Sequence, residues 1–208
     1  DKLPGDVPHG WKFIKVGPDG KLYVPVGAPC NICESDDRYT KIFRMNLDGS
    51  GVEVVAHGMR NTVGFDFHPK TGNLWFTDNQ RDWLSEDLPE DELNEVSKPG
   101  EHFGYPYCHS GDFADPELGW GKNCADYKKP AVKLGGPWNR TQKYAGDVVV
   151  AFPDGKGGAR VEPFLTGLVE NNQYLGRPAD VMVMKDGSLL VSDDHNGAIY
   201  RITYSGRK

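Results

Sequence analysis

A polar turn containing a glycine runs directly into an apolar strand at Gly17-Pro-Asp-Gly-Lys-Leu-Tyr-Val-Pro-Val26. The same order of turn and strand recurs at His68-Pro-Lys-Thr-Gly-Asn-Leu-Trp-Phe-Thr77 and at Met184-Lys-Asp-Gly-Ser-Leu-Leu-Val-Ser192. A hairpin unit that repeats along a chain is typical of a β-propeller. We therefore predict an all-β fold of this type in which each leading strand pairs with the strand that trails it. The predicted pairs are Lys21–Val26 with Lys41–Asn46, Asn73–Thr77 with Leu93–Val96, and Ser188–Ser192 with Ala198–Thr203.

The composition agrees with a strand-rich fold and excludes some functions. The 208 residues include 26 glycines and 15 prolines, which disfavours long helices, while 11% aromatic residues can supply a core. A net charge of -6 matches nucleic acid poorly, so we expect no nucleic-acid partner. No apolar run approaches the ~20 residues of a membrane helix, so we expect no membrane span. No signal peptide is recognisable, which fits a cytosolic protein, a mature chain or a fragment.

The four cysteines form two local pairs, Cys30 with Cys33 and Cys108 with Cys124. A Cys-Asn-Ile-Cys motif can be half of a zinc site or a redox pair, but no second motif of this kind completes a zinc site with four cysteine ligands. The interpretation we favour is two disulfides in loops, which would indicate an oxidising compartment.

The chain is predicted to be one propeller domain over residues 1–208, with about four blades' worth of sequence. A trailing strand at Gly146–Phe152 indicates a further unit, but residues 130–137 are too few for its leading turn and strand. A long loop insertion occupies about residues 81–129, and its aromatic content predicts that it is ordered. A bridge between Cys108 and Cys124 would close this loop.

Several polar residues lie in loops at predicted strand ends, where a propeller gathers residues from distant blades. His9, Arg60 and Arg177 each precede the leading strand of a unit. Singly, each has an ordinary interpretation: packing for His9, turn capping for Arg60 with Asn61, and surface charge for Arg177. Asp193-Asp194-His195 fits turn capping as well as a metal site. Together, a histidine and arginines around one depression suit an anionic, polycarboxylate ligand, because guanidinium groups pair with carboxylates.

These stretches closely resemble the pyrroloquinoline-quinone (PQQ)-dependent sugar dehydrogenases, in the branch of L-sorbosone and aldose sugar dehydrogenases, which are similar to soluble glucose dehydrogenase. The resemblance runs over almost the whole chain. It implies a six-bladed propeller with PQQ in the central depression and Ca²⁺ beside it. The stretches that carry it are His9-Gly-Trp with Gly17–Val24, Gly58-Met-Arg-Asn61 with Gly64–His68, Asp91–Asn94 with Gly100–Pro106, Trp138-Asn-Arg-Thr141, and Gly176–Val181.

The resemblance also implies roles for particular residues. His9 would be the general base for the sugar hydroxyl while hydride passes to the quinone, and Arg60 would stabilise the negative charge that grows on the quinone oxygen. Asn61, Trp138 and Arg177 would bind the cofactor. Asn79 and Gln80 stand where the family supplies calcium ligands, partly through backbone carbonyls.

The chain departs from the family in length and in one motif. We expect an N-terminal blade or blades, and a unit between Leu134 and Trp138, to be absent from it. The second arginine of the family's Gly-Arg-x-Arg pattern is Ala179 here. A propeller with fewer blades must close differently, pair with another chain, or leave an edge exposed.

We therefore carry two functions forward. The first is PQQ-dependent oxidation of an aldose or sugar aldehyde in the periplasm or outside the cell, with a cytochrome or a quinone as electron acceptor. The second is a cofactor-free propeller remnant that binds carbohydrate or another protein. A calcium-dependent lactonase is a weaker third, because no cluster of acidic and amide side chains aimed at a central metal is evident.

Overall fold

The computed structural model describes residues 3–5, 7–135, 140–143 and 146–206. They form an all-β structure in which the one helical element described is a short 3-10 turn, η1 (Cys124–Asp126). The all-β class predicted from the sequence is therefore confirmed. The chain divides into two compact units, residues 1–139 with 153–159, and residues 140–152 with 160–208. The number of blades and their closure into one domain stay predictions.

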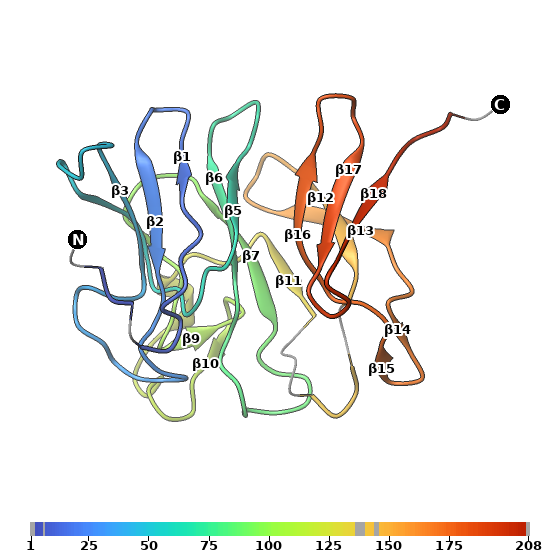
Figure 1. Cartoon of the computed structure of the whole chain (residues 1–208). Helices are drawn as coiled ribbons and strands as arrows, with labels where there is room; N and C mark the ends of the chain where they lie inside the picture. Colours follow the sequence, from blue (N-terminus) through green and yellow to red (C-terminus); the bar gives the residue numbers. More distant parts are fainter. Residues whose placement is uncertain (1–2, 6, 136–139, 144–145, 207–208) are drawn as a thin grey trace. The chain divides into compact units, whose positions relative to one another are not determined.

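The first unit contains two sheets that each hold four adjacent antiparallel strands, as a propeller blade does (Figure 1). The first sheet has the order β1-β2-β3-β4, and β8 joins β4 in parallel at its edge. The second has the order β11-β7-β6-β5. The strands are β1 (Lys15–Val16), β2 (Leu22–Val26), β3 (Lys41–Met45), β4 (Glu53–His57), β5 (Phe65–Phe67), β6 (Leu74–Asp78), β7 (Asp91–Val96), β8 (Glu101–His102) and β11 (Val132–Leu134).

The second unit is built around a three-stranded sheet with the order β16-β17-β18. Two hairpins precede it, β12 with β13 and β14 with β15. The predicted trailing strand at Gly146–Phe152 corresponds to β12. The strands are β12 (Val148–Pro153), β13 (Ala159–Leu165), β14 (Val169–Glu170), β15 (Gln173–Tyr174), β16 (Pro178–Val183), β17 (Leu189–Asp193) and β18 (Ala198–Ile202).

All three strand pairs predicted from the repeats are confirmed. β2 pairs with β3, β6 with β7, and β17 with β18, each antiparallel. The turns between β1 and β2, β5 and β6, and β16 and β17 hold a glycine with positive φ at Gly20, Gly72 and Gly187. Side-chain-bearing residues rarely adopt this conformation, which explains why glycine recurs at this point of the unit.

The core of the first unit lies between its two sheets. Phe76 of β6 is 1% exposed and meets the ring of Phe103 edge-to-face, with the ring centroids 4.9 Å apart. Alternation along β6 and β7 directs every second side chain to this core, because successive strand residues point to opposite faces. The core residues are Tyr23, Ile42, Val55, Ala56, Met59, Phe65, Leu74, Phe76, Val96 and Phe103.

The predicted loop insertion of about residues 81–129 includes β7, and most of it lies in the segment between β7 and β11. It carries β8 and a small hairpin of β9 (Cys108–His109) with β10 (Phe113–Ala114). Disulfides join Cys108 to Cys124 and Cys30 to Cys33, with Cα atoms 5.6 Å and 6.2 Å apart. Both predicted bridges are therefore present, and Cys108–Cys124 ties β9 to η1.

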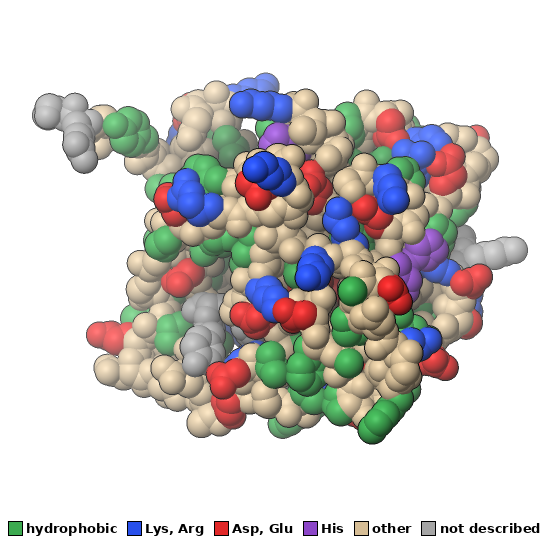
Figure 2. Space-filling model, turned by 180° about the vertical axis from the view of Figure 1, so that it is seen from behind, with side chains coloured by type: hydrophobic (Ala, Val, Ile, Leu, Met, Phe, Trp, Pro, Cys, Tyr) green, Lys and Arg blue, Asp and Glu red, His purple; other side chains and the backbone are tan. Residues whose placement is uncertain are grey.

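The surface mixes both signs of charge. On the face shown in Figure 2, acidic and basic side chains lie interspersed and form no broad patch of one sign. Among the described residues, no helix has the length and apolar character needed to cross a membrane.

The two disulfides should differ in their effect on stability. A loop with a sequence separation of 16 closes at Cys108–Cys124 and one of 3 at Cys30–Cys33. In the chain-entropy model, we expect Cys108→Ser/Cys124→Ser to lower the free energy of unfolding by about 3 kcal/mol, and Cys30→Ser/Cys33→Ser by roughly half as much. Urea unfolding followed by tryptophan fluorescence measures both. Equal losses, or a larger loss for the short loop, would contradict this account.

Candidate functional site

The loop that enters the second sheet of the first unit is held by one buried carboxylate. Asp78, the last residue of β6, is 1% exposed. Its Oδ2 accepts the backbone N–H of Arg60 at 3.0 Å, and its Oδ1 accepts that of Asn61 at 2.7 Å. This loop belongs to no sheet, and the carboxylate accepts the backbone N–H groups that a neighbouring strand would otherwise bind. Its two bonds fix the direction in which the Arg60 side chain leaves the main chain.

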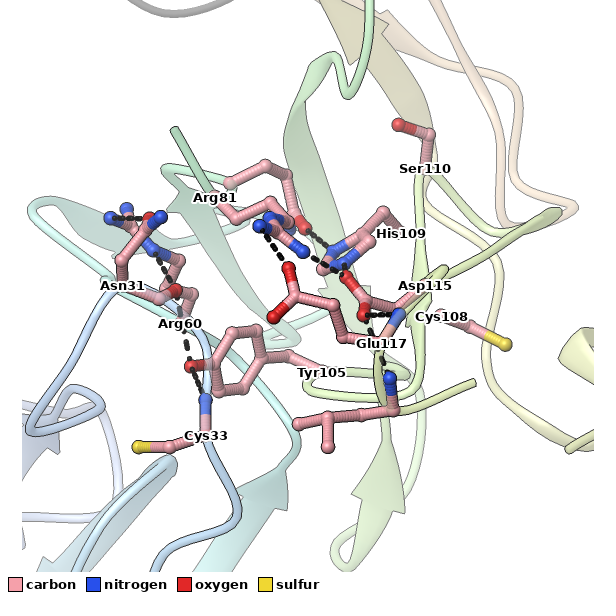
Figure 3. A network of polar contacts seen from close by, with 12 residues as sticks. Asn31, Cys33, Arg60, Arg81, Tyr105, Cys108, His109, Ser110, Asp115 and Glu117 are labelled. Carbon is pink, nitrogen blue, oxygen red and sulfur yellow. Dashed lines mark hydrogen bonds and ion pairs between the residues drawn. The ribbon is translucent and has the colours of Figure 1, made fainter. Parts of the chain in front are cut away.

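The guanidinium of Arg60 is fixed in turn by four hydrogen bonds. Nε donates to the Asn31 carbonyl at 2.9 Å, and Nη2 donates to Asn31 Oδ1 at 2.9 Å and to Asp82 Oδ2 at 3.0 Å. Nη1 donates to the Asn79 carbonyl at 3.2 Å. Figure 3 shows Arg60 lying against Asn31. Since a guanidinium has five N–H groups, one N–H of Nη1 has no partner among the described residues and is left for a ligand.

His9 is prepared to accept a proton. Its Nδ1 lies 2.7 Å from the Ala28 carbonyl, which can only accept, so Nδ1 carries the hydrogen. Nε2 then bears the lone pair of the neutral ring, and no hydrogen bond to it occurs among the described residues. Burial lowers the pKa of His9 below its usual 6.5, and the positive charge of Arg60 lowers it further, against opposing effects of Ala28 and Asp82. The imidazole is therefore neutral at pH 7.

Gly27 allows His9 and Arg60 to lie close together. A methyl group on Gly27 would come within 2.9 Å of both His9 Cβ and the Arg60 carbonyl oxygen. Ala28 N–H also donates to that carbonyl at 2.7 Å. The predicted neighbourhood of His9, Arg60 and Asn61 is thus formed inside the first unit. The sequence analysis missed Gly27, although it follows directly on a repeat strand.

Arg177 is anchored in the second unit as Arg60 is in the first. Its backbone N–H donates to Oδ1 of Asp193, the last residue of β17, at 2.9 Å. That bond and others from Asn196 and Tyr200 hold the pKa of Asp193 well below its usual value, although burial opposes them. The Arg177 side chain is 51% exposed, and its Nε lies 3.7 Å from Asp194. Asp78 and Asp193 close the repeat strands Leu-Trp-Phe-Thr-Asp and Leu-Leu-Val-Ser-Asp, a signal that could have identified both as anchors.

Two parts of the predicted site stay predictions. Trp138 lies outside the described residues. Arg177 belongs to the second unit and is described by its contacts there, so a depression shared with His9, Arg60 and Asn61 remains an expectation.

Comparison with known proteins bears on this site. The family model "Glucose / Sorbosone dehydrogenase" matches residues 5–151. This chain belongs to that family. A Borreliella burgdorferi protein described as uncharacterized is 31% identical over 234 residues, which cover 94% of this chain. The chain spans 61% of that relative's length.

Solved structures resemble this member of the glucose/sorbosone dehydrogenase family over most of its length. A calcium structure of a Trichoderma reesei carbohydrate-active enzyme of family AA12 superposes with a TM-score of 0.81 at 18% identity, covering 96% of this chain and 69% of its own. The soluble aldose sugar dehydrogenase of Escherichia coli, in its apo-form, superposes with a TM-score of 0.61 at 20% identity, covering 89% of this chain and 62% of its own. An oxidoreductase of Thermus thermophilus described as a glucose dehydrogenase has a TM-score of 0.57 at 27% identity, covering 88% of this chain and 60% of its own.

In the turn predicted to bind calcium, the side chain of Gln80 makes internal contacts. Gln80 is 2% exposed, its Nε2 donates to Asp78 at 2.9 Å, and its Oε1 lies 2.7 Å from His109 Nδ1. The carbonyl of Asn79 already accepts from the cationic Arg60. The described residues hold no group of three or more His, Cys, Asp or Glu arranged for a metal. The Gln80 side chain thus does not fit a calcium ion, and the main-chain oxygens of this turn and the Asn79 side chain are left as ligands.

Behind the turn lies a buried ionic network that the sequence analysis did not identify (Figure 3). His109 is fully buried, with Nε2 2.9 Å from Asp115 Oδ2. Arg81 donates to the same Asp115 oxygen at 2.7 Å and to Glu117 at 2.7 Å. Burial raises the pKa of Asp115, but the hydrogen bonds from Arg81 and His109 outweigh it and bring it to about 2. The network connects the insertion to the turn after β6.

Asp78 also faces a second buried carboxyl group. It pairs across the sheet with Glu92 of β7, which is 1% exposed. Burial raises the pKa of Asp78 to about 7 and that of Glu92 to about 8, and the negative charge of Asp78 adds to the shift of Glu92. Two such groups opposite each other are disfavoured when both are ionised.

This pair predicts a stability that falls as pH rises. Because both pKa values are raised, the folded state binds more protons than the unfolded state between about pH 5 and pH 8, and stability is lost over that range. We expect Glu92→Gln to reduce the loss by about 1 kcal/mol or more, since one pKa unit corresponds to about 1.4 kcal/mol. Urea unfolding at both pH values measures it. Glu95→Gln, the same change on the other face of β7, is the control; an identical pH dependence for Glu92→Gln and wild type would contradict the prediction.

Proposed function

We propose that this protein is a quinone-dependent sugar dehydrogenase that oxidises an aldose or a sugar aldehyde, with PQQ as hydride acceptor. The observation that carries the proposal is the pairing of a neutral His9, whose Nε2 bears a lone pair, with the buried guanidinium of Arg60. Membership of the glucose/sorbosone dehydrogenase family supports the same reaction class.

His9 acts as the general base in this proposal. The bond from Nδ1 to the Ala28 carbonyl selects the tautomer that leaves Nε2 free, and the lowered pKa keeps the ring unprotonated. Nε2 takes the proton from the sugar hydroxyl while hydride leaves the carbon that bears this hydroxyl. The Ala28 carbonyl then stabilises the imidazolium, because Nδ1–H remains directed at it.

Arg60 supplies positive charge where negative charge develops. Its side chain is 6% exposed and its guanidinium is fixed by protein partners, so it needs little rearrangement during the reaction. Asn61, Trp138 and Arg177 complete the proposed cofactor site, where Arg177 pairs with a cofactor carboxylate. A bound quinone would supply the electrophilic carbonyl carbon that accepts the hydride.

Compartment and partners follow from the same reaction. Two disulfides suit the periplasm or the extracellular space. A cytochrome or a quinone would take the electrons onward. Calcium remains part of the proposal through the main-chain oxygens of the Asn79-Gln80 turn and the Asn79 side chain, and no step is derived through it.

A cofactor-free sugar-binding module is the second candidate. The observation that favours it is a cavity of about 180 Å³ in the first unit, lined by Tyr39, Tyr105 and Tyr107 together with the carboxylates of Glu34 and Asp37. Aromatic faces beside hydrogen-bond acceptors suit a sugar ring without any redox chemistry.

The first test is dye reduction by the purified protein with PQQ, Ca²⁺ and a panel of aldoses. We expect His9→Asn to lower kcat by ~10²–10⁴-fold, the usual contribution of a general base. Asparagine tolerates the positive φ of +60° at this position and can still donate to Ala28. His68→Asn, in the turn before β6, should leave kcat unchanged. Wild type that binds the quinone but reduces no dye would contradict the proposal, and sugar binding without quinone binding would favour the second candidate.

The pH profile supplies a further test. His9 must be neutral to act as base, and its pKa lies below 6.5. We therefore expect the acid limb of the kcat/KM profile to have its midpoint below pH 6.5. An acid limb centred above pH 6.5 would contradict the role of His9 as base.

A further inference from the structure

Asn31 connects three segments that are distant in the sequence. Its Oδ1 accepts from Arg60 Nη2 at 2.9 Å and from the backbone N–H of Asp82 at 2.8 Å. Its Nδ2 donates to the Asp82 carbonyl at 3.1 Å. Its own carbonyl accepts from Arg60 Nε at 2.9 Å and from the Tyr105 hydroxyl at 3.3 Å. One asparagine thus contacts Arg60 through both side chain and main chain.

The Cys30–Cys33 disulfide closes the chain around Asn31. With Cα atoms 6.2 Å apart, the bridge limits the main-chain conformations open to the two residues between its ends. The hydroxyl of Tyr105 accepts the backbone N–H of Cys33 at 3.3 Å, which fixes the loop from the side of the insertion. Figure 3 shows Tyr105 directed at Asn31 and Cys33.

We propose that Asn31, held by the Cys30–Cys33 bridge, is the positioning residue for Arg60. The consequence for catalysis rests on the proposed function, whereas the positioning itself does not. A long arginine side chain has considerable rotamer freedom, and a charge serves a reacting group only when it is held in place. Asn31 removes that freedom by accepting from both Nε and Nη2.

Asn31 also determines how Asp82 meets Arg60. Its amide binds both the N–H and the carbonyl of Asp82, so the Asp82 main chain is fixed beside the guanidinium. In this arrangement a single ion-pair contact, Oδ2 to Nη2 at 3.0 Å, joins the two residues. Without the amide, the Asp82 main chain is no longer held beside the guanidinium, and Arg60 Nη2 loses one of its two acceptors. The positive charge would then no longer be held in one place, and the guanidinium would become more accessible.

The test measures the accessibility of Arg60 to phenylglyoxal, with modified peptides quantified by mass spectrometry. We expect at least a tenfold higher modification rate at Arg60 in Asn31→Ala than in wild type. Asn31→Asp keeps both acceptor contacts of Oδ1 and should stay within about threefold of wild type. Asn46→Ala, which removes an asparagine from an exposed turn of the same unit, is the matched control and should equal wild type. An Asn31→Ala rate within twofold of wild type would overturn the proposal.

The Cys30→Ser/Cys33→Ser variant tests the role of the bridge. It also replaces Asn31→Ala as the test of Arg60 positioning if that variant does not fold. It keeps every atom of Asn31 and should raise the Arg60 rate by about threefold or more, whereas an unchanged rate would show that the bridge does not hold Asn31. In the dye assay, Asn31→Ala should lower kcat about tenfold with KM changed less, and Asn31→Asp should recover most of it. Wild type without dye reduction would contradict the proposed function alone, because the modification rates do not depend on turnover.

Discussion

The carboxylate of Asp78 is the constraint on which the candidate site depends. It ends a core strand, is 1% exposed, and accepts from the main chain of Arg60 and Asn61 and from the Gln80 amide. A buried carboxyl group with raised pKa and no ion-pair partner among the described residues is costly. Its neighbours offset that cost only while they donate to it, so the loop carrying Arg60 and the turn after β6 are tied to one another.

The same device recurs where β17 ends. Asp193 holds the main chain of Arg177 as Asp78 holds that of Arg60. The first sheet does not use an aspartate here. Its repeat strand ends in Val26, and His9, which lies next to Gly27, is fixed by the Ala28 carbonyl. Arg60 and Arg177 thus each have their main chain held by an aspartate at the end of a strand, whereas His9 lies beside the glycine that follows a strand. This difference separates the proposed charge-stabilising residues from the proposed base.

The sequence predicted what depends on local patterns. Turn glycines and alternating apolar residues identified β2 with β3, β6 with β7 and β17 with β18, and cysteine spacing identified both bridges. Long-range side-chain contacts could not be read in this way. Arg60 binds Asn31 across 29 residues, and Arg81 binds Asp115 across 34, and no periodic pattern marks such pairs. Gln80 illustrates the limit of resemblance, since a side chain expected near calcium binds Asp78 and His109.

In the proposed enzyme, His9 and Arg60 share one ligand, a carboxylated quinone. The most direct measurement is a crystal structure of the protein grown with PQQ and Ca²⁺. We expect quinone density in contact with the remaining N–H of Arg60 and next to Nε2 of His9, with hydrogen bonds of about 3 Å. Quinone bound away from both residues, or none bound while a sugar occupies the tyrosine-lined cavity, would contradict it.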